Sequence, residues 1–167
     1  ICTRSCGFCN VATGKPLEAD PFEPGRVANS VKLMNVKHAV ITSVDRDDLP
    51  DGGSEIWART VRAIRHQSPG TTLETLIPDF AGKWENLARI IQVAPEIVSH
   101  NLETVRRLTK EVRIQAKYDR SLEALRRLRQ AGIKTKSGVM LGLGESFEEV
   151  VETMDDLRSV DCQILTL

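Results

Sequence analysis

Three cysteines fall within the first nine residues, and their type and spacing point to metal chemistry. Cys2, Cys6 and Cys9 form the pattern Cys-x3-Cys-x2-Cys, and the only other cysteine is Cys162. Thiolates this close in sequence can share a metal from one loop, whereas such short spacings are awkward for a disulfide. Structural zinc and ordinary electron-transfer clusters take four protein ligands. Three cysteines therefore predict a metal centre with one coordination position open for another molecule.

The spacing by itself leaves the kind of metal open. Zinc would need a fourth ligand, either Cys162 or one of His38, His66 and His100. Inert thiols are the weaker alternative, because buried structural cysteines do not usually cluster in this way, although Cys162 alone is interpreted as a small core residue. We favour an iron–sulfur cluster, in which three thiolates leave one iron free. Clustered free thiols also indicate a reducing compartment.

Length and composition limit the class of protein. The 167 residues are 41% hydrophobic and 28% charged, which suits one soluble domain with a real core. Acidic and basic residues balance at 23 each, so no basic excess indicates nucleic-acid binding. No apolar segment approaches the roughly 20 residues that span a bilayer. We therefore expect neither a nucleic-acid nor a membrane partner.

Hydrophobic periodicity predicts strands that alternate with helices. The expected strands are residues 38–43, 72–77, 96–99, 134–141 and 163–167. The expected helices are residues 23–36, a helix capped by Ser54, one around 87–91, a short one at 102–108, one at 119–131, and one that begins at a Ser146–Glu149 capping box. Alternation at roughly 30-residue intervals is typical of βαβ units and a parallel sheet.

Polar and glycine-rich motifs follow four of the expected strands. They are residues 42–53, 78–79, 100–103 and 142–145. In parallel α/β folds the functional groups gather at the carboxyl ends of the strands. We therefore expect these four segments to surround the cysteine loop. The charged residues 45–51 are either a solvated loop or a lid for docking a partner.

These motifs resemble a known family. The cysteine pattern, with Phe8 before the last cysteine, resembles the radical S-adenosylmethionine (SAM) enzymes. More narrowly, residues 2–16, 42–53, 78–80, 99–104 and 140–145 resemble, in order, the motifs of the lipoyl synthases. The resemblance implies an α/β fold, a partial (β/α) barrel with a parallel sheet. Residues 1–167 would then be one incomplete radical SAM core domain, which we expect to be truncated at both ends.

The resemblance also implies roles for individual residues. Cys2, Cys6 and Cys9 would hold a catalytic [4Fe-4S] cluster. The residues that would contact SAM are Phe8, Ser43, Gly52, Gly53, Asn101, Glu103, Arg113, Lys136 and Gly142. Simpler interpretations stay open: the paired glycines can form a turn, Asn101 and Glu103 can cap a helix, and Arg113 and Lys136 can be surface charges.

The activity implied is insertion of two sulfur atoms into a protein-bound octanoyl group. The carriers would be lipoyl domains of 2-oxoacid dehydrogenase acyltransferase subunits and the glycine cleavage carrier protein, with flavodoxin or ferredoxin as electron donor. An auxiliary [4Fe-4S] cluster is expected in the full-length protein only, so residues 1–167 alone should lack full activity. A bacterial cytoplasm is the expected location, with mitochondria and plastids as alternatives. A biotin synthase-like enzyme and a zinc-binding structural domain are the competing hypotheses.

Overall fold

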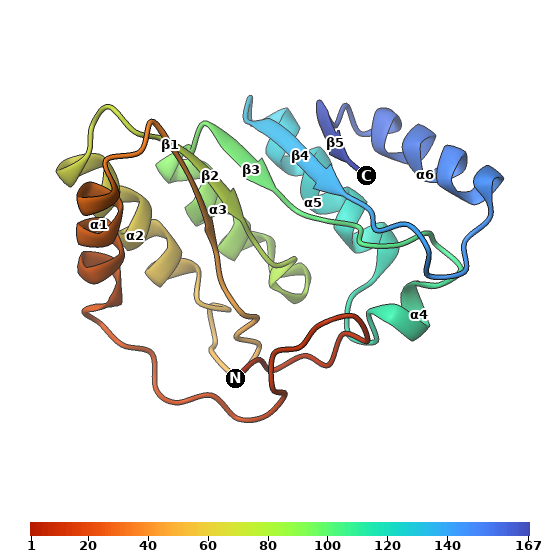
Figure 1. Ribbon diagram of the computed structural model, residues 1–167, viewed down its shortest axis with the longest axis horizontal. Coiled ribbons are helices and arrows are strands. Elements are labelled where there is room, and N and C mark those ends of the chain that lie inside the picture. The colour runs from red at the N-terminus through yellow and green to blue at the C-terminus, as the bar shows by residue number, and fades with distance from the viewer.

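One parallel sheet organises the molecule. The computed structural model describes residues 1–167, and its five strands are hydrogen-bonded side by side in chain order (Figure 1). The strands are β1 His38–Thr42, β2 Thr72–Leu76, β3 Ile97–Ser99, β4 Lys134–Gly138 and β5 Ile164–Thr166. All five strands expected from the sequence are confirmed, although β4 ends at Gly138 rather than at residue 141. The pairs are in regular register, for example Thr42 opposite Leu76.

Helices alternate with the strands along the chain, and the longer helices lie against one side of the sheet (Figure 1). They are α1 Glu23–Met34, α2 Ser54–Gln67, α3 Trp84–Val93, α4 Thr109–Val112, α5 Tyr118–Gln130 and α6 Phe147–Ser159, with a 3-10 turn at Phe80–Gly82. Sequential parallel strands with helices on one side are the arrangement of a (β/α) barrel segment. No helix is both long and apolar enough to cross a membrane.

Apolar side chains fill the space between the sheet and the helices. One group includes Trp57, Val98 and Leu128, and a second joins Ile64 of α2 to Leu73 of β2. The period of two along a strand places alternate residues on this face, and the helical period aligns one stripe of each helix with it. Burying each large apolar side chain contributes about 1.5–3 kcal/mol to folding. This layer supports the loops at the strand ends.

Helix ends show where local rules hold and where they fail. The capping box at α6 is confirmed, because Ser146 accepts a hydrogen bond from the Glu149 amide and Glu149 binds the Ser146 amide. The expected cap at Ser54 is wrong. Gly53 occupies that position in a left-handed conformation, and the Asp51 carboxylate accepts from the amides of Gly53 and Glu55. Asp51 satisfies two amides at the start of the helix at once.

The short helix expected at residues 102–108 is also displaced. The chain instead forms an isolated bridge between Glu103 and Val139, then turns, and becomes helical only over α4, Thr109–Val112. The Glu103 amide donates to the Gly138 carbonyl and the Glu103 carbonyl accepts from the Met140 amide, so neither group is available to a helix that begins here. The helix α6 is buried only in part, because Phe147 at its start is 78% exposed while Leu157 near its end is buried.

Candidate functional site

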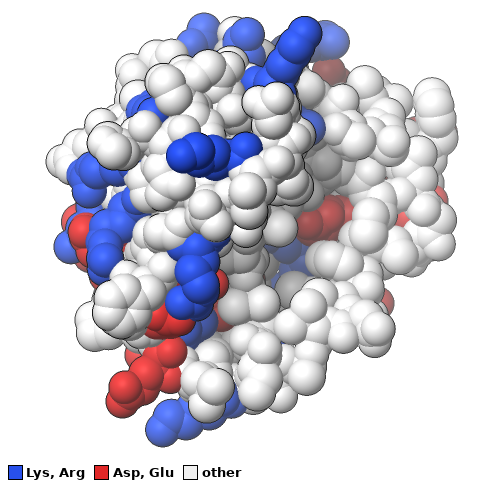
Figure 2. Space-filling model, turned by 60° about the vertical axis from the view of Figure 1, so that its left-hand side comes forward, with Lys and Arg blue, Asp and Glu red and all other residues white.

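A cavity of about 500 Å³ lies where the cysteine loop crosses the carboxyl ends of the strands. Figure 2 shows the molecule hollowed, with acidic and basic side chains inside the hollow. The polar and cysteine residues that line the cavity are Cys2, Arg4, Cys6, Cys9, Thr42, Ser43, Asp45, His100, Asn101, Glu103 and Arg113. All three clustered cysteines therefore face one space, together with side chains that follow β1 and β3.

The loop bearing the cysteines has no regular secondary structure, yet it is tied at several points. The Cys2 amide donates to Ala12 and the Cys9 amide donates to the Cys6 carbonyl at 3.1 Å, which closes a turn between two of the thiols. Cys2 is buried and Cys9 is exposed, with Cys6 between them in exposure. Burial raises the pKa of the Cys6 thiol, against the opposing charge of Arg113.

The donor set fits a cluster better than a single ion. No group of three His, Cys, Asp or Glu side chains converges on one point. A cubane binds each thiolate through a different iron, so its three ligands need to surround a volume rather than meet at a point. Three cysteines that line one cavity of about 500 Å³ fit that requirement.

The candidate fourth ligands for zinc lie elsewhere or are already bonded. Cys162 packs beside the apolar group that includes Leu157, and its thiol donates to the Ile164 carbonyl. His100 lines the cavity, but its two ring nitrogens lie 2.9 Å from the Ile77 carbonyl and 2.9 Å from the Ser121 hydroxyl. Its burial lowers its pKa to about 4, so the ring is neutral at physiological pH. These positions count against a closed zinc site.

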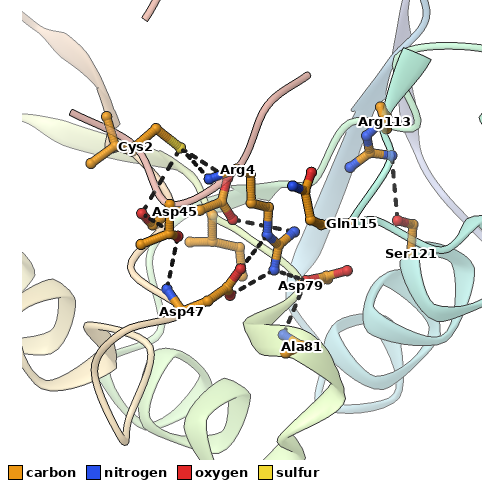
Figure 3. Close-up of polar contacts among 12 residues, drawn as sticks. Cys2, Arg4, Asp45, Asp47, Asp79, Ala81, Arg113, Gln115 and Ser121 are labelled. Carbon is orange, nitrogen blue, oxygen red and sulfur yellow. Dashed lines mark hydrogen bonds and ion pairs between the residues drawn. The ribbon is translucent and has the colours of Figure 1, made fainter. Parts of the chain in front are cut away.

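Arg4, between the first two cysteines, is buried among three carboxylates (Figure 3). Its guanidinium nitrogens lie 2.7 Å from Asp47, 2.7 Å from Asp79 and 3.3 Å from Asp45. Asp79 also pairs with Arg120 at 2.6 Å. Burial opposes ionisation of Asp79, but the nearby positive charges, that of Arg4 first, and the hydrogen bond from Arg4 together outweigh burial and lower its pKa to about 2. Burial prevails for Asp45, the most distant of the three, and raises its pKa.

Asn101 and Glu103 reach the cavity from the segment after β3. The Asn101 amide donates to the Glu103 carboxylate at 3.2 Å, and neither residue caps a helix, so that simpler interpretation is wrong. Glu103 has a φ of 64°, a left-handed conformation that costs free energy for a residue with a side chain. Its backbone bonds to Gly138 and Met140 impose this conformation. Burial raises the pKa of its carboxyl.

Arg113 is a buried cation at the cavity wall, not a surface charge. It is 7% exposed and donates to the Leu102 carbonyl at 2.9 Å. Burial lowers its pKa, while the charges of Glu103, Asp79 and Cys6 oppose that shift. A guanidinium remains protonated even so, which places a fixed positive charge beside Cys6 and Glu103.

The structure does not bring every predicted contact to this cavity. Phe8 and Ser43 line it, but Gly52 and Gly53 line a neighbouring cavity of about 310 Å³ that shares Ser43. Lys136 lies on the face of the sheet opposite the helices and pairs with Glu74 at 3.0 Å, so it is not a free surface charge. Gly142 lies in the loop after β4, where its amide donates to the Glu145 carboxylate. Cofactor contacts stay predictions for these four residues and for the residues that line the cavity.

The sequence did not reveal the contacts of Arg4, and of the two interpretations of residues 45–51 the freely solvated loop is wrong, whereas a docking role stays a prediction. Asp45 and Asp47 bind Arg4, Arg46 pairs with Asp48, and Asp51 caps α2. The segment is therefore fastened to the cysteine loop and to α2 rather than being freely solvated. An arginine between two cysteines, with aspartates after a strand, was the available signal.

Comparison with known proteins agrees with this geometry. The sequence matches the Radical SAM superfamily over residues 1–157. A structure of Streptococcus suis SuiB bound to S-adenosylmethionine covers 99% of this chain and 38% of its own, with a TM-score of 0.75 at 16% identity. One of TsrM from Kitasatospora setae, with cobalamin and [4Fe-4S] cluster bound, covers 98% and 33%, with a TM-score of 0.67 at 17% identity. The chain belongs to the radical SAM superfamily, and its sheet is part of the partial barrel of that fold.

Within the superfamily, the chain is similar to lipoyl synthases over all its residues. It is 66% identical to the lipoyl synthase of Flavobacterium johnsoniae and 67% identical to the mitochondrial lipoyl synthase of Nematostella vectensis. In both comparisons the alignment covers 100% of this chain and 58% of the relative, so the chain spans a little over half of their length.

Proposed function

We propose that residues 1–167 form the radical SAM core domain of a lipoyl synthase. The observation that carries the proposal is the single cavity lined by Cys2, Cys6 and Cys9 and by the polar side chains after β3. Identity of 66% to a lipoyl synthase over the whole chain narrows the activity within the superfamily. The spacing of motifs from the cysteine loop to residue 145 supports the same assignment.

In this proposal the three thiolates hold a [4Fe-4S] cluster, and SAM occupies the rest of the cavity. The bound cluster supplies the electron that splits SAM into methionine and a 5′-deoxyadenosyl radical. Asn101 and Glu103 present oxygen and amide groups suited to ribose hydroxyls. Arg113 offers a cation for the SAM carboxylate, which a guanidinium binds well. Phe8 contributes an apolar wall, and Ser43 contributes polar groups from the end of β1.

The substrate would be an octanoyl chain on the lysine of a lipoyl carrier domain. Two SAM molecules would be cleaved in turn, and each 5′-deoxyadenosyl radical would remove one hydrogen atom from one of two carbons, where sulfur would then be inserted. Carriers would be 2-oxoacid dehydrogenase acyltransferase subunits and the glycine cleavage carrier protein, with flavodoxin or ferredoxin as electron donor. Sulfur would come from an auxiliary [4Fe-4S] cluster held by parts of the full-length protein other than these residues.

The proposed location is a reducing compartment, because three clustered thiols must stay free. A bacterial cytoplasm is our proposal. Mitochondria and plastids are the alternatives, since the similar proteins include a bacterial and a mitochondrial lipoyl synthase.

Anaerobic reconstitution of residues 1–167 with iron and sulfide tests the cluster assignment. We expect about four irons per chain and broad charge-transfer absorption. Cys6→Ala should lose both, whereas Cys162→Ala, a matched change outside the cavity, should retain both. Tightly bound zinc without that absorption would overturn the assignment.

The activity is tested on the full-length chain, with an octanoylated carrier and SAM, by mass spectrometry of the carrier. A carrier mass that stays unchanged would refute the proposed activity.

A further inference from the structure

Arg4 is a buried charged residue, and burying a charge costs free energy unless other groups compensate it. It lies between Cys2 and Cys6 and is 5% exposed. Within its own loop only its backbone is bonded: the Arg4 amide donates to the Cys2 sulfur at 3.4 Å, and the Thr13 hydroxyl donates to the Arg4 carbonyl. Its side-chain partners come from two other loops. Asp45 and Asp47 follow β1, and Asp79 follows β2. Burying a guanidinium is unfavourable unless its donors are matched by well-placed acceptors, and here two nitrogens contact Asp47 at 2.7 and 2.9 Å.

The opposite flank of the cysteine loop is tied to a different part of the chain. The Gly7 amide donates to the Val112 carbonyl at 2.8 Å, and the Gln115 side chain bonds Ser5 at 3.1 Å. The cysteine loop is thus attached to the strand ends on one side and, on the other, to Val112 at the end of α4 and to Gln115 just after it. Arg4 makes the ion pairs that attach the loop to the strand ends, and these ion pairs form without a metal.

Charge gives Arg4 a second effect. The Asp45 carboxylate lies 4.0 Å from the Cys2 sulfur. A carboxylate so close to a metal-bound thiolate would repel it, and the repulsion is strong in a site partly shielded from water. Arg4 lies 3.3 Å from the same carboxylate and offsets its charge. Removing Arg4 would leave the three aspartates facing the cysteine loop with less compensating charge.

We propose that Arg4, Asp45, Asp47 and Asp79 form a clasp that fixes the cysteine loop over the strand ends and compensates the negative charge beside the cluster. This inference rests on the cluster assignment in the proposed function. Arg4 is a positioning residue, because it acts through the cysteines and not on the substrate. Arg4 contributes to the clasp in two ways. Its forked guanidinium fixes the geometry of the contacts, and its positive charge offsets the carboxylates; a lysine would supply only the charge.

The test compares Arg4→Gln, Arg4→Lys and the control Arg126→Gln in the full-length chain after anaerobic reconstitution. Arg126 is exposed and pairs only with Glu123 on α5. Two readouts are taken: the rate of iron loss to a chelator and the midpoint potential of the cluster. We expect Arg4→Gln to lose iron at least tenfold faster and to shift the potential to a more negative value. Arg4→Lys should lose iron faster with little change in potential, and Arg126→Gln should match the wild type.

Wild-type rates and potential in a folded Arg4→Gln protein would overturn the clasp. If Arg4→Gln does not fold, judged by circular dichroism, Asp47→Asn decides, because it removes one acceptor and leaves Asp45 and Asp79 in place. Unchanged iron loss in Asp47→Asn would then overturn the proposal, and faster loss would support it. If the wild-type chain takes up no cluster, both the proposed function and the clasp fail. If the wild-type chain takes up a cluster but the Arg4 and Asp47 variants behave like it, only the clasp fails.

Discussion

The cysteine loop and the sheet-and-helix layer are stabilised in opposite ways. The layer is built from regular elements with apolar groups between them, such as Ile64 and Leu73. The segment from residue 1 to residue 22 contains no helix or extended strand, and its fixed points are ion pairs and backbone bonds. Apolar burial is non-directional and gives bulk stability, whereas a buried arginine with three carboxylates specifies a position. The difference indicates a rigid support that carries a precisely positioned loop.

The largest effect should come from the layer. Leu125 is fully buried on α5, so Leu125→Ala should lower the free energy of unfolding by about 2–5 kcal/mol. Urea denaturation measures it. Leu17→Ala is the matched change in the loop region, where the side chain is 86% exposed, and should have almost no effect. Equal losses from the two variants would contradict the contrast between the regions.

Acid should lower the free energy of unfolding through His100, which lies between the cysteine loop and the sheet-and-helix layer. Burial and then the charge of Arg113 lower its folded pKa to about 4, against an ordinary value of 6.5. The unfolded chain therefore binds more protons between these values, so this stability is present above pH 6.5 and is lost as the pH falls toward 4. We expect a loss of about 2 kcal/mol between pH 7 and pH 5. His100→Gln should flatten that dependence in urea titrations, and His66→Gln, at an exposed site, should leave it unchanged.

A glycine substitution sharpens the comparison at the cavity. A β-carbon at Gly138 would lie 3.0 Å from the Asn101 side-chain oxygen, so Gly138→Ala should displace Asn101. If Asn101 contacts SAM, affinity measured by calorimetry should fall about tenfold, roughly 1.4 kcal/mol. Gly25→Ala, which has nothing within 4 Å, should leave affinity unchanged and stabilise α1 slightly. Unaltered affinity in Gly138→Ala would remove Asn101 from the proposed contacts.

The smallest effect concerns a helix end distant from the cysteines. Ser146→Ala removes the capping box of α6 and should cost about 1 kcal/mol in thermal or urea unfolding. Iron content after reconstitution should not change, since the cap serves the layer only. A loss of iron in this variant would show that the two regions are coupled more widely than the contacts indicate.

Sequence patterns predicted the layer well because its rules are local. The apolar period, which predicts all five strands, and the Ser146–Glu149 box, which predicts the start of α6, each depend on residues a few positions apart. The displaced helix at 102–108 shows the limit, since bridging of Glu103 to Val139 involves residues far apart in the chain. Strand-end placement likewise brought Ser43, Asn101 and Glu103 to the cavity, but not Lys136.

The sequence by itself determined the alternation of strands and helices and the family, and it predicted the three-cysteine ligand set, because each depends on spacing and residue type. Only the tertiary structure decided that Arg4 is buried against Asp45, Asp47 and Asp79, and that Lys136 pairs with Glu74. The physical reason is that a charged side chain has the same local signal whether it is solvated or paired. Its partners come from other loops, which meet only when the parallel strands align their carboxyl ends.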